Sequence, residues 1–520
     1  MDSQSIIIFT DISLNEIAYG YDTTEVGTAH IRDADDGWAI LQALQDESLN
    51  LDSVLVAFGD AWPWLNSSDA PEDLRPDPSE NWTSLDPQVS WVRGVVDSLG
   101  DNNVLVEKGS ILQYQFDSSL SPGAQRIVDR IRDQYDSDNP VSLVGIGTAT
   151  DILKVINELN KTDDLDLVKS ITLEMGLYER YYDGLFFESK EGIEFVDDSN
   201  MVNDIGAMIE LLSIDEKPPI YFVPFNSVRM GFLYPDDLFC LPKTELNSLL
   251  VEGTEKMYYD QEAASKGFHF WDLVTLVSES SKSFFETVPV TAEIVSDEPS
   301  YPGAKGALKL ANTSNLTSNL FVKRMPLKYE SEIFENTQID PATQGVLFPQ
   351  FDAYNKFDDA LLTQFALNAY YAFYDANLQL AINNGSQIDG SSVADVLIGY
   401  QEADQLIGFS GDDILTGQGG RDYLSGGDGD DFLCGGIEND TLEGGYGSDT
   451  FVVGFGVDII LDFNACEGDR VAMRNFQDIK FQQVGQDLTI SSATGEVTAI
   501  LLNTTLQEFD SDLGLVLYGK

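Results

Sequence analysis

The chain has few basic residues for its length. Its 520 residues include 29 lysines and arginines against 88 aspartates and glutamates, which gives a formal charge of −59. A charge of this size and sign repels nucleic acid and anionic lipid and attracts cations. We therefore expect neither DNA, RNA nor a membrane surface as a partner.

Cysteine, histidine and long apolar runs are also scarce. Cys240, Cys434 and Cys466 are too few and too scattered for a disulfide framework or a zinc site, so we expect small core residues. Two histidines do not support a Ser-His-Asp or Cys-His arrangement. No stretch approaches the roughly 18 apolar residues of a membrane-spanning helix. The early IIIF run has no basic region before it, which predicts a buried strand rather than a signal peptide.

Short apolar strands alternate with helical patterns up to about residue 336. Strand candidates include IIIFTD, SVLVAFGD and VSLVGIG, and helix candidates include DDGWAILQALQD and ATDILKVINEL. This alternation predicts an α/β domain with a mostly parallel central sheet. Ligands of such sheets bind beyond the carboxyl ends of the strands, and Asp11, Asp60 and Asp151 fall there.

A nine-residue repeat begins near residue 395. Each repeat has a glycine-rich turn, then an aspartate, then a large apolar residue two positions later. Glycines permit tight turns, carboxylates and turn carbonyls bind Ca²⁺, and leucines fill the interior. The pattern therefore predicts a parallel β-roll of the calcium-binding nonapeptide (RTX) type. Its expected calcium residues are Asp395, Asp404, Asp413, Asp422, Asp431, Asp440 and Asp449.

The repeat region also indicates where the protein acts. Glu402 and Glu438 replace a turn glycine and are expected to weaken calcium binding there. Residues 456–520 resemble the C-terminal part of type I secretion substrates, which implies the type I secretion apparatus as a partner. The protein is then expected to be extracellular and bacterial, without a cleaved N-terminal signal. Extracellular calcium modules bind at roughly 10⁻⁴–10⁻³ M, so the roll would fold outside the cell.

Four segments are therefore expected along the chain, because 520 residues exceed one hydrophobic core. They are an α/β domain (1–336), a helical connector (337–392), the β-roll (393–455) and a β-rich C-terminal region (456–520). The connector contains the helical pattern FDDALLTQFALNAYYAFYDANLQLAI.

Three carboxylates crowd the start of the first predicted helix, at Asp33, Asp35 and Asp36. At about 5 Å and an effective dielectric of about 20, each like-charge pair costs on the order of 3 kcal/mol. A hard cation such as Ca²⁺ would offset that repulsion, because it prefers oxygen ligands. The alternative is ordinary helix capping by one of the three.

Residues 1–335 resemble the inosine–uridine-preferring nucleoside hydrolases in the order and spacing of six segments. Among them are IIIFTD, RDADDGWAILQALQD, VSLVGIGTATDILKVI, SITLEMG and FHFWDLVTLV. The resemblance implies one catalytic Ca²⁺, held by Asp36, Asp272, the Thr150 carbonyl, and either Asp11 or Asp33. Spacing does not decide between the last two, because an insertion separates them.

The same resemblance implies a hydrolase that cleaves the N-glycosidic bond of a nucleoside substrate. The Asp11 or Asp33 carboxylate would activate water, with Asp35 also in the catalytic group. The implied ribose and base contacts are Asp35, Asp60, Asp198, Asn200 and Trp271. Asp60, Asp151 and Asp198 depart from the family pattern, which has Asn, Asn and Glu there. Two alternatives therefore stand: an inactive binding or surface-layer protein, and a hydrolase of another glycosidic substrate.

Overall fold

In the computed structural model, the chain folds into two compact units. One unit comprises residues 1–232 and 245–370, and the other residues 233–244 and 371–520. The residues described are 3–12, 34–46, 48–57, 85–98, 103–110, 117–178, 187–189, 192–194, 200, 204–224, 232–233, 268–269, 271–280, 285–296, 306–313, 318–324, 338–339, 346–347, 377–380, 387–399, 403–453, 456–474, 479–491, 497–509 and 515–518.

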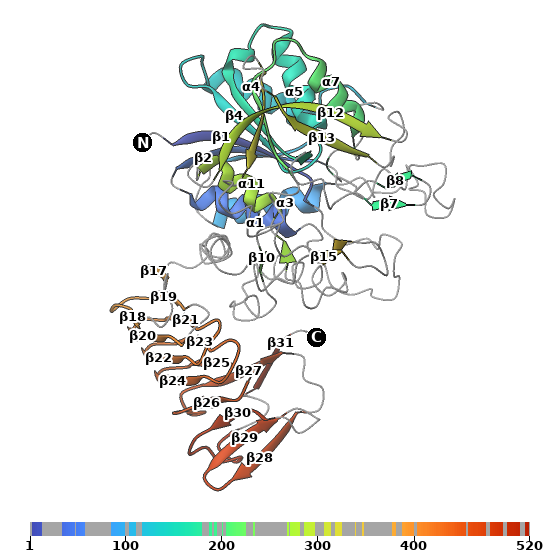
Figure 1. The fold of residues 1–520 in the computed structure, drawn as a ribbon. Helices are drawn as coiled ribbons and strands as arrows, with labels where there is room; N and C mark the ends of the chain where they lie inside the picture. Colours follow the sequence, from blue (N-terminus) through green and yellow to red (C-terminus); the bar gives the residue numbers. More distant parts are fainter. Residues whose placement is uncertain are drawn as a thin grey trace, which may run out of the picture. The chain divides into compact units, whose positions relative to one another are not determined.

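The first unit is built on a ten-stranded sheet with the strand order β3-β2-β1-β4-β5-β9-β14-β12-β13-β6 (Figure 1). Neighbouring strands from β3 to β14 pair in parallel. Strand β12 pairs antiparallel with both β14 and β13. The strands are β1 (Gln4–Thr10), β2 (Leu49–Val56), β3 (Leu105–Lys108), β4 (Val141–Gly145), β5 (Val168–Glu174), β6 (Leu177–Tyr178), β9 (Ile220–Val223), β12 (Glu286–Ser296), β13 (Gly306–Asn312) and β14 (Leu320–Arg324).

Helices cover both faces of this sheet, so the predicted mostly parallel α/β architecture is confirmed (Figure 1). Helices α4, α5 and α7 lie on one face, and α1, α3 and α11 on the other. Their bounds are α1 (Ala34–Gln45), α3 (Asp86–Ser98), α4 (Pro122–Gln134), α5 (Thr150–Asn160), α7 (Ile205–Ser213) and α11 (Trp271–Ser280), with a short 3-10 turn, η2 (Leu165–Leu167). Small two-stranded pairs are β7 (Phe187–Ser189) with β8 (Gly192–Glu194), β10 (Phe232–Leu233) with β11 (Phe268–His269), and β15 (Gln338–Ile339) with β16 (Val346–Leu347).

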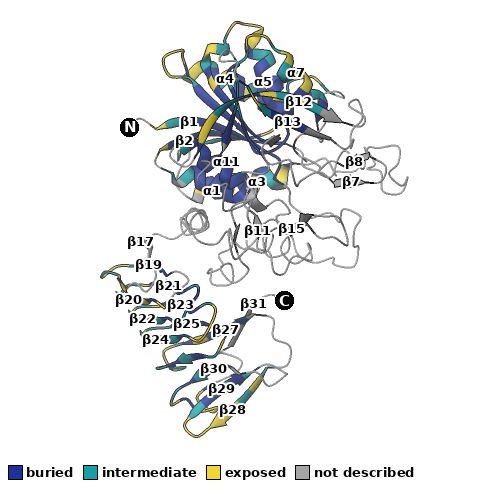
Figure 2. Ribbon diagram, in the orientation of Figure 1, coloured by how far each residue is buried: buried dark blue, intermediate teal, exposed yellow. Residues whose placement is uncertain are grey.

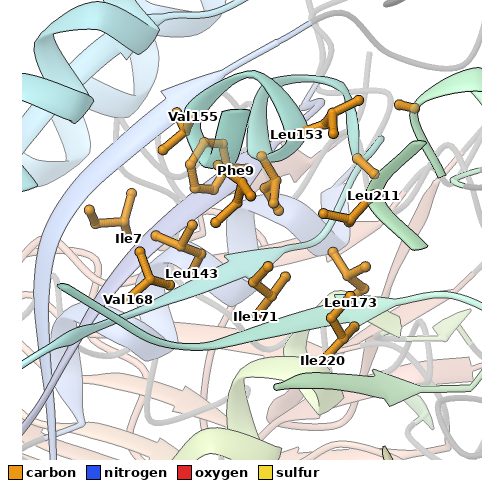
Figure 3. Packing of buried hydrophobic residues seen from close by; sticks show 14 of the residues in the cluster. Ile7, Phe9, Leu143, Leu153, Val155, Val168, Ile171, Leu173, Leu211 and Ile220 are labelled. Carbon is orange, nitrogen blue, oxygen red and sulfur yellow. The ribbon is translucent and has the colours of Figure 1, made fainter. Parts of the chain in front are cut away.

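The main core lies between the sheet and helices α4, α5 and α7. Phe9, Leu143 and Ile171 from the strands pack with Val155 and Leu211 from the helices, all buried (Figure 3). Most residues of the parallel strands are buried, as expected for strands that are covered on both faces. Figure 2 shows the same central strands as the most buried part of the unit.

The second unit contains two sheets. Successive half-coils of the repeat pair in parallel in both, and the second sheet ends in antiparallel pairs between β28, β29 and β30. One has the order β17-β19-β21-β23-β25-β27-β31, and the other β18-β20-β22-β24-β26-β30-β29-β28. The first sheet comprises β17 (Asn377–Leu380), β19 (Asp395–Ile398), β21 (Ile414–Thr416), β23 (Phe432–Cys434), β25 (Thr450–Val453), β27 (Arg470–Arg474) and β31 (Leu515–Tyr518). The second comprises β18 (Gln387–Asp389), β20 (Gln405–Ser410), β22 (Tyr423–Asp428), β24 (Thr441–Tyr446), β26 (Asp458–Ile460), β28 (Lys480–Val484), β29 (Asp487–Ser491) and β30 (Val497–Leu501).

The large apolar residue of every repeat lies inside the roll. Leu406 pairs with Leu424, and Leu424 with Leu442, in register along the second sheet. The full column is completely buried: Leu397, Leu406, Leu415, Leu424, Leu433, Leu442 and Phe451. The predicted β-roll with apolar residues inside is therefore confirmed.

Two expectations differ from the structure. Asn377–Leu380 lies within the predicted connector helix, yet it forms β17 and pairs in parallel with Asp395–Ile398. The open edge of the roll supplies hydrogen bonds that override the local helical pattern.

The cysteines differ in part from the expected small core residues. Cys434 is buried, as expected, but it is disulfide-bonded. Cys466 is exposed and free, and Cys240 lies outside the described residues.

Candidate functional site

Asp11 directly follows the carboxyl end of β1 and is 2% exposed. A Cβ atom on Gly147, just after β4, would lie 2.4 Å from the Asp11 Oδ1 atom. The Asp11 carboxylate therefore lies across the turn that follows β4. A side chain at position 147 would displace it.

Asp36 belongs to the first turn of α1 and is completely buried. The Thr10 hydroxyl donates a hydrogen bond to Asp36 Oδ1 and accepts one from the Ile12 amide at 3.2 Å. This contact ties the start of α1 to the end of β1. Asp11 and Asp36 are consequently held at the same edge of the sheet.

Thr150 begins α5 at this edge and is completely buried. Its hydroxyl donates to Asp204 Oδ2 at 2.5 Å, and Thr148 donates to the Thr150 hydroxyl oxygen at 3.2 Å. Asp204 also caps α7, because its Oδ1 accepts the Ala207 amide at 3.1 Å. The Asp-x-x-Ala spacing is a recognisable helix-capping signal for Asp204.

Asp151 lies next to Thr150 and forms a buried network with Ser110 and Lys154. Ser110 donates its amide to Asp151 Oδ2 at 2.8 Å and its hydroxyl to Oδ1 at 2.7 Å. The Lys154 ammonium donates to the Ser110 hydroxyl oxygen at 2.8 Å. Burial raises the pKa of Asp151, and the charge of Asp204 raises it further, whereas Ser110 and Lys154 oppose the rise. Sequence reasoning identified neither Ser110 nor Lys154, because the two are 44 residues apart.

Asn200 lies against the end of β5. Its side-chain amide donates to the Glu174 carbonyl at 3.1 Å and to the Glu174 carboxylate. Both residues are buried. Glu174 was not anticipated from sequence, where it is simply the last polar residue of a buried strand.

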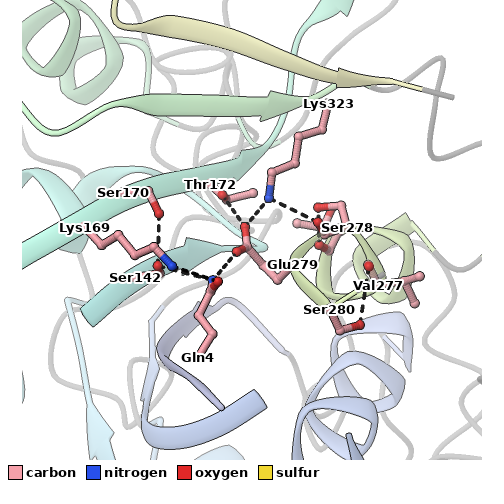
Figure 4. Close-up of polar contacts among 11 residues, drawn as sticks. Gln4, Ser142, Lys169, Ser170, Thr172, Val277, Ser278, Glu279, Ser280 and Lys323 are labelled. Carbon is pink, nitrogen blue, oxygen red and sulfur yellow. Dashed lines mark hydrogen bonds and ion pairs between the residues drawn. The ribbon is translucent and has the colours of Figure 1, made fainter. Parts of the chain in front are cut away.

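Asp272 is 4% exposed in the first turn of α11, and a buried polar cluster anchors the other end of that helix. Glu279 forms an ion pair with Lys323 and accepts hydrogen bonds from Thr172 and, at 2.6 Å, from Gln4 (Figure 4). Burial alone would raise the pKa of Glu279, but Lys323 and the hydrogen bonds hold it below its usual value. The cluster fixes α11 along its axis and so determines where Asp272 lies.

Five of the predicted site residues of the α/β unit lie in the described part of the chain with their side chains. Asp11, Asp36, Thr150, Asn200 and Asp272 are all buried and follow strand ends or begin helices. Asp33, Asp60 and Asp198 lie outside the described residues, as do the side chains of Asp35 and Trp271. Within the described ranges, no group of three or more His, Cys, Asp or Glu side chains is arranged to hold a metal ion. The donors present are all oxygens, which suits a hard cation.

The repeat aspartates of the roll form a ladder with a step of 18 residues, two repeats. The Asp395 amide donates to Asp413 Oδ1 at 2.7 Å, and the Asp413 amide to Asp431 Oδ1 at 2.8 Å. On the other side, the Asp404 amide donates to Asp422 Oδ1 at 2.7 Å. One carboxylate oxygen of each inner aspartate therefore joins adjacent coils.

The second carboxylate oxygen, Oδ2, of several of these aspartates is buried and accepts no hydrogen bond from the described residues. Among the described residues, the buried Oδ2 atoms with no hydrogen-bond partner include those of Asp413, Asp422, Asp431, Asp440 and Asp449. Burial raises the pKa of Asp422 and Asp431 to about 8 and that of Asp449 to about 7. Buried carboxylate oxygens of this kind require a proton or a cation.

The turn glycines place carbonyl oxygens beside these Oδ2 atoms. A Cβ on Gly408 would lie 2.2 Å from Asp413 Oδ2 and 2.6 Å from the Gly426 carbonyl oxygen. A Cβ on Gly417 would likewise meet Asp422 Oδ2 and the Gly435 carbonyl. Carboxylate and carbonyl oxygens at one point form the donor set that calcium takes. The repeat turns therefore fit Ca²⁺.

Comparison with known families agrees with this geometry. Residues 389–424, 407–442 and 425–460 match the model of the RTX calcium-binding nonapeptide repeat. Residues 389–460 are RTX repeats. No curated protein sequence matches the chain.

Several solved structures similar to this chain are described as nucleoside hydrolases. A plant nucleoside hydrolase has a TM-score of 0.44 and 11% identity, covering 72% of this chain and 99% of its own. An inosine-uridine preferring nucleoside hydrolase from Bacillus anthracis has 0.41 and 10%, covering 71% and 99%. A purine-preferring ribonucleoside hydrolase from Gardnerella vaginalis has 0.37 and 14%, covering 71% and 99%. Similarity at this level adds no weight to a particular reaction.

The RTX turns tolerate several departures from glycine. Glu438 adopts the left-handed conformation with φ of 79°, and Phe409 and Gln418 do so with φ of 77° and 70°. Side chains rarely adopt this region, which costs roughly 1–2 kcal/mol per residue. Sequence reasoning identified Glu438 as irregular but missed Phe409 and Gln418. Glu402 lies outside the described residues.

No helix within the described ranges is long and apolar enough to cross a membrane.

Proposed function

We propose that the first unit is a calcium-dependent hydrolase that cleaves the N-glycosidic bond of nucleosides to ribose and free base. The observation that carries the proposal is the burial of three carboxylates that follow a strand or begin a helix: Asp11, Asp36 and Asp272 are each at most 4% exposed. Buried carboxylates are retained where a cation or a reaction needs them. The order of the matching sequence segments supports the choice of reaction.

Calcium would be held by Asp36, Asp272, the Thr150 carbonyl, and Asp11 or Asp33. When bound, a metal of this kind lowers the pKa of a water molecule and orients it. The Asp11 or Asp33 carboxylate would accept the proton of that water. The hydrogen bond from Thr10 would hold the Asp36 carboxylate in place as a calcium ligand.

The remaining site residues would position the sugar. Asp35, Asp60, Asp198 and Asn200 would bind the ribose hydroxyls. The negative charge of the three aspartates would stabilise the oxocarbenium character that develops as the bond breaks. Trp271 would stack on the departing base. Carboxylates stabilise the oxocarbenium-like transition state of O-glycoside hydrolysis, and the same role is assigned here to an N-glycosidic bond by chemical analogy.

The RTX repeats would serve export through a type I secretion apparatus and calcium-driven folding outside a bacterial cell. Low cytoplasmic calcium would leave the buried Oδ2 atoms of residues such as Asp422 and Asp431 without a cation. Extracellular calcium would then assemble the roll.

The decisive experiment is hydrolysis of a nucleoside panel by the full chain in calcium. We expect ribose release, and at least about a 100-fold loss of kcat/KM in Asp36→Asn. Asp431→Asn serves as the matched control, because it removes a carboxylate from the roll and should leave hydrolysis unchanged. Absence of ribose release from any nucleoside by a folded protein would refute the hydrolase.

One observation favours a second candidate, an inactive binding protein with this fold. The Asn200 amide already donates to Glu174, and both carboxylate oxygens of Asp151 accept hydrogen bonds from Ser110, whose hydroxyl oxygen accepts one from Lys154. Nucleoside binding in calorimetry without ribose release would support this candidate. A third candidate, hydrolysis of another glycosidic substrate, would give reducing sugar from a glycoside panel instead.

A further inference from the structure

The last coil of the roll differs from the inner ones in length. The inner steps of the aspartate ladder span 18 residues, as from Asp413 to Asp431. The final step runs from the Asp449 amide to Asp469 Oδ1, at 3.0 Å, and spans 20. Two residues have therefore been added to the turn that precedes Asp469.

The added residues change the surroundings of the Asp469 carboxylate. Its Oδ2 accepts the Asn464 amide at 2.7 Å, so both oxygens of this buried side chain are hydrogen-bonded. Asn464 is five residues before Asp469, the position that Gly426 occupies relative to Asp431. Asp431 Oδ2 is buried without a partner among the described residues. A backbone N–H thus points at Asp469 Oδ2, and an N–H dipole repels a cation.

A second difference is at Asp462. It lies 18 residues, or one full coil, after Gly444, at the position where the earlier coils have the first glycine of the turn. Its Oδ1 accepts the Gly444 amide at 3.0 Å and its Oδ2 accepts the Gly445 amide at 2.9 Å. On the same side of the roll, the Gly390 amide donates to the Ile407 carbonyl at 2.7 Å instead. The N–H groups that donate to Asp462 and Asp469 favour the charged form of each carboxylate, while burial acts in the opposite direction and raises the pKa of Asp469 to about 6 and that of Asp462 above its usual value.

Apolar contacts hold this turn in place independently of calcium. The Phe463 ring, between Asp462 and Asn464 in the chain, lies 6.5 Å from the Phe451 ring and 5.3 Å from the Phe509 ring, centroid to centroid. Phe463 and Phe509 are buried. The turn is therefore part of the hydrophobic core at the end of the roll.

We propose that residues 462–469 form a metal-independent cap that ends the calcium-binding series on the side of the roll carrying Asp413, Asp431 and Asp449. In this cap, four backbone N–H groups donate hydrogen bonds to the four carboxylate oxygens of Asp462 and Asp469. Asp469 continues the aspartate ladder but binds no calcium. The cap goes beyond the proposed hydrolase and does not depend on it.

The test counts calcium ions bound per full-length chain, by equilibrium dialysis against radioactive Ca²⁺. Asp431→Asn should bind at least one ion fewer than the wild-type protein. Asp469→Asn is the matched substitution, because Asp469 follows Asp449 in the same aspartate ladder. This variant should bind as many calcium ions as the wild-type protein. Loss of an ion in Asp469→Asn equal to that in Asp431→Asn would overturn the proposal, as would an unchanged count in Asp431→Asn.

Thermal unfolding of the same variants gives a second readout. Asp469→Asn should lower the melting temperature of the roll by a similar amount at saturating calcium and at the lowest calcium concentration that keeps the wild-type roll folded, because it removes a metal-independent contact. Asp431→Asn should lower the melting temperature chiefly at saturating calcium. If Asp469→Asn does not fold, Asp462→Asn decides: an unchanged calcium count supports the cap, and a reduced count overturns it.

Discussion

The amide of Asp413 donates to Asp431 Oδ1 at 2.8 Å, although the two residues are 18 positions apart. This contact gives the repeat aspartate two roles. One carboxylate oxygen joins neighbouring coils, and the other faces the turn where calcium belongs. Stability and metal binding in the roll therefore depend on the same side chains.

The calcium-free roll should become more stable as the pH falls. Burial raises the pKa of Asp422 and Asp431 to about 8, far above the unfolded value of about 3.9. The folded state therefore binds more protons between these limits, so its stability is full below about pH 4 and is lost as the pH rises through 8. Circular dichroism of chelated protein between pH 8.5 and 5 should show increasing β-structure.

The same titration in excess calcium provides the control, because its sign is opposite. Protons compete with Ca²⁺ for the carboxylates, so the calcium-loaded roll should lose stability as the pH falls. Repeating both series at high ionic strength screens the long-range repulsion of a chain with charge −59. Equal trends with and without calcium would contradict the assignment of these carboxylates to the metal.

Gly426→Ala should weaken calcium binding and destabilise the roll. Its Cβ would lie 2.2 Å from Asp431 Oδ2, where nothing can move aside without displacing the carboxylate. Overpacking of this kind costs about 1–3 kcal/mol. Gly485→Ala is the control, because its φ of 70° strains an alanine but nothing lies within 4 Å. A higher calcium midpoint in a fluorescence titration is expected for Gly426→Ala and not for Gly485→Ala.

Leu424→Ala should destabilise the roll by about 2–5 kcal/mol, because a completely buried leucine leaves a cavity between Leu406 and Leu442. Denaturant unfolding in calcium, followed by circular dichroism, measures the loss. Val484→Ala, at a position 51% exposed, should stay within about 0.5 kcal/mol of the wild-type protein. A loss no larger at Leu424 than at Val484 would argue against a single packed column.

The roll was predictable because every repeat has the same residue types at the same positions. Aspartate, glycine and leucine recur in phase, so the column around Leu424 and the ladder through Asp431 follow from the period alone. The cap was not predictable, because Asp469 breaks the nine-residue phase by two. The strand at Asn377–Leu380 was missed since an isolated helical pattern cannot reveal an open sheet edge nearby.

In the α/β unit the sequence predicted positions better than partners. Asp11, Asp36 and Thr150 could be placed at the carboxyl edge because each follows a strand or begins a helix. Their contacts join residues distant in the chain, such as Thr150 with Asp204, 54 positions apart. No local pattern encodes such pairs.

Lys154→Met should destabilise the α/β unit by about 3–5 kcal/mol, because it leaves the Asp151 carboxylate buried without its cation. Asp151→Asn should also be destabilising, since Lys154 then lacks a counter-charge. The double variant removes both charges and should be more stable than the sum of the single losses predicts, with a coupling of about 0.5–3 kcal/mol.

Tryptophan fluorescence can measure this cycle without interference from the roll, because all six tryptophans precede residue 272. Unfolding should be followed in excess calcium, so that the RTX repeats stay folded in every variant. Additive losses would mean that Lys154 and Asp151 act independently and that Ser110 does not link them. A positive coupling would identify Lys154 as the residue that compensates the buried charge of Asp151.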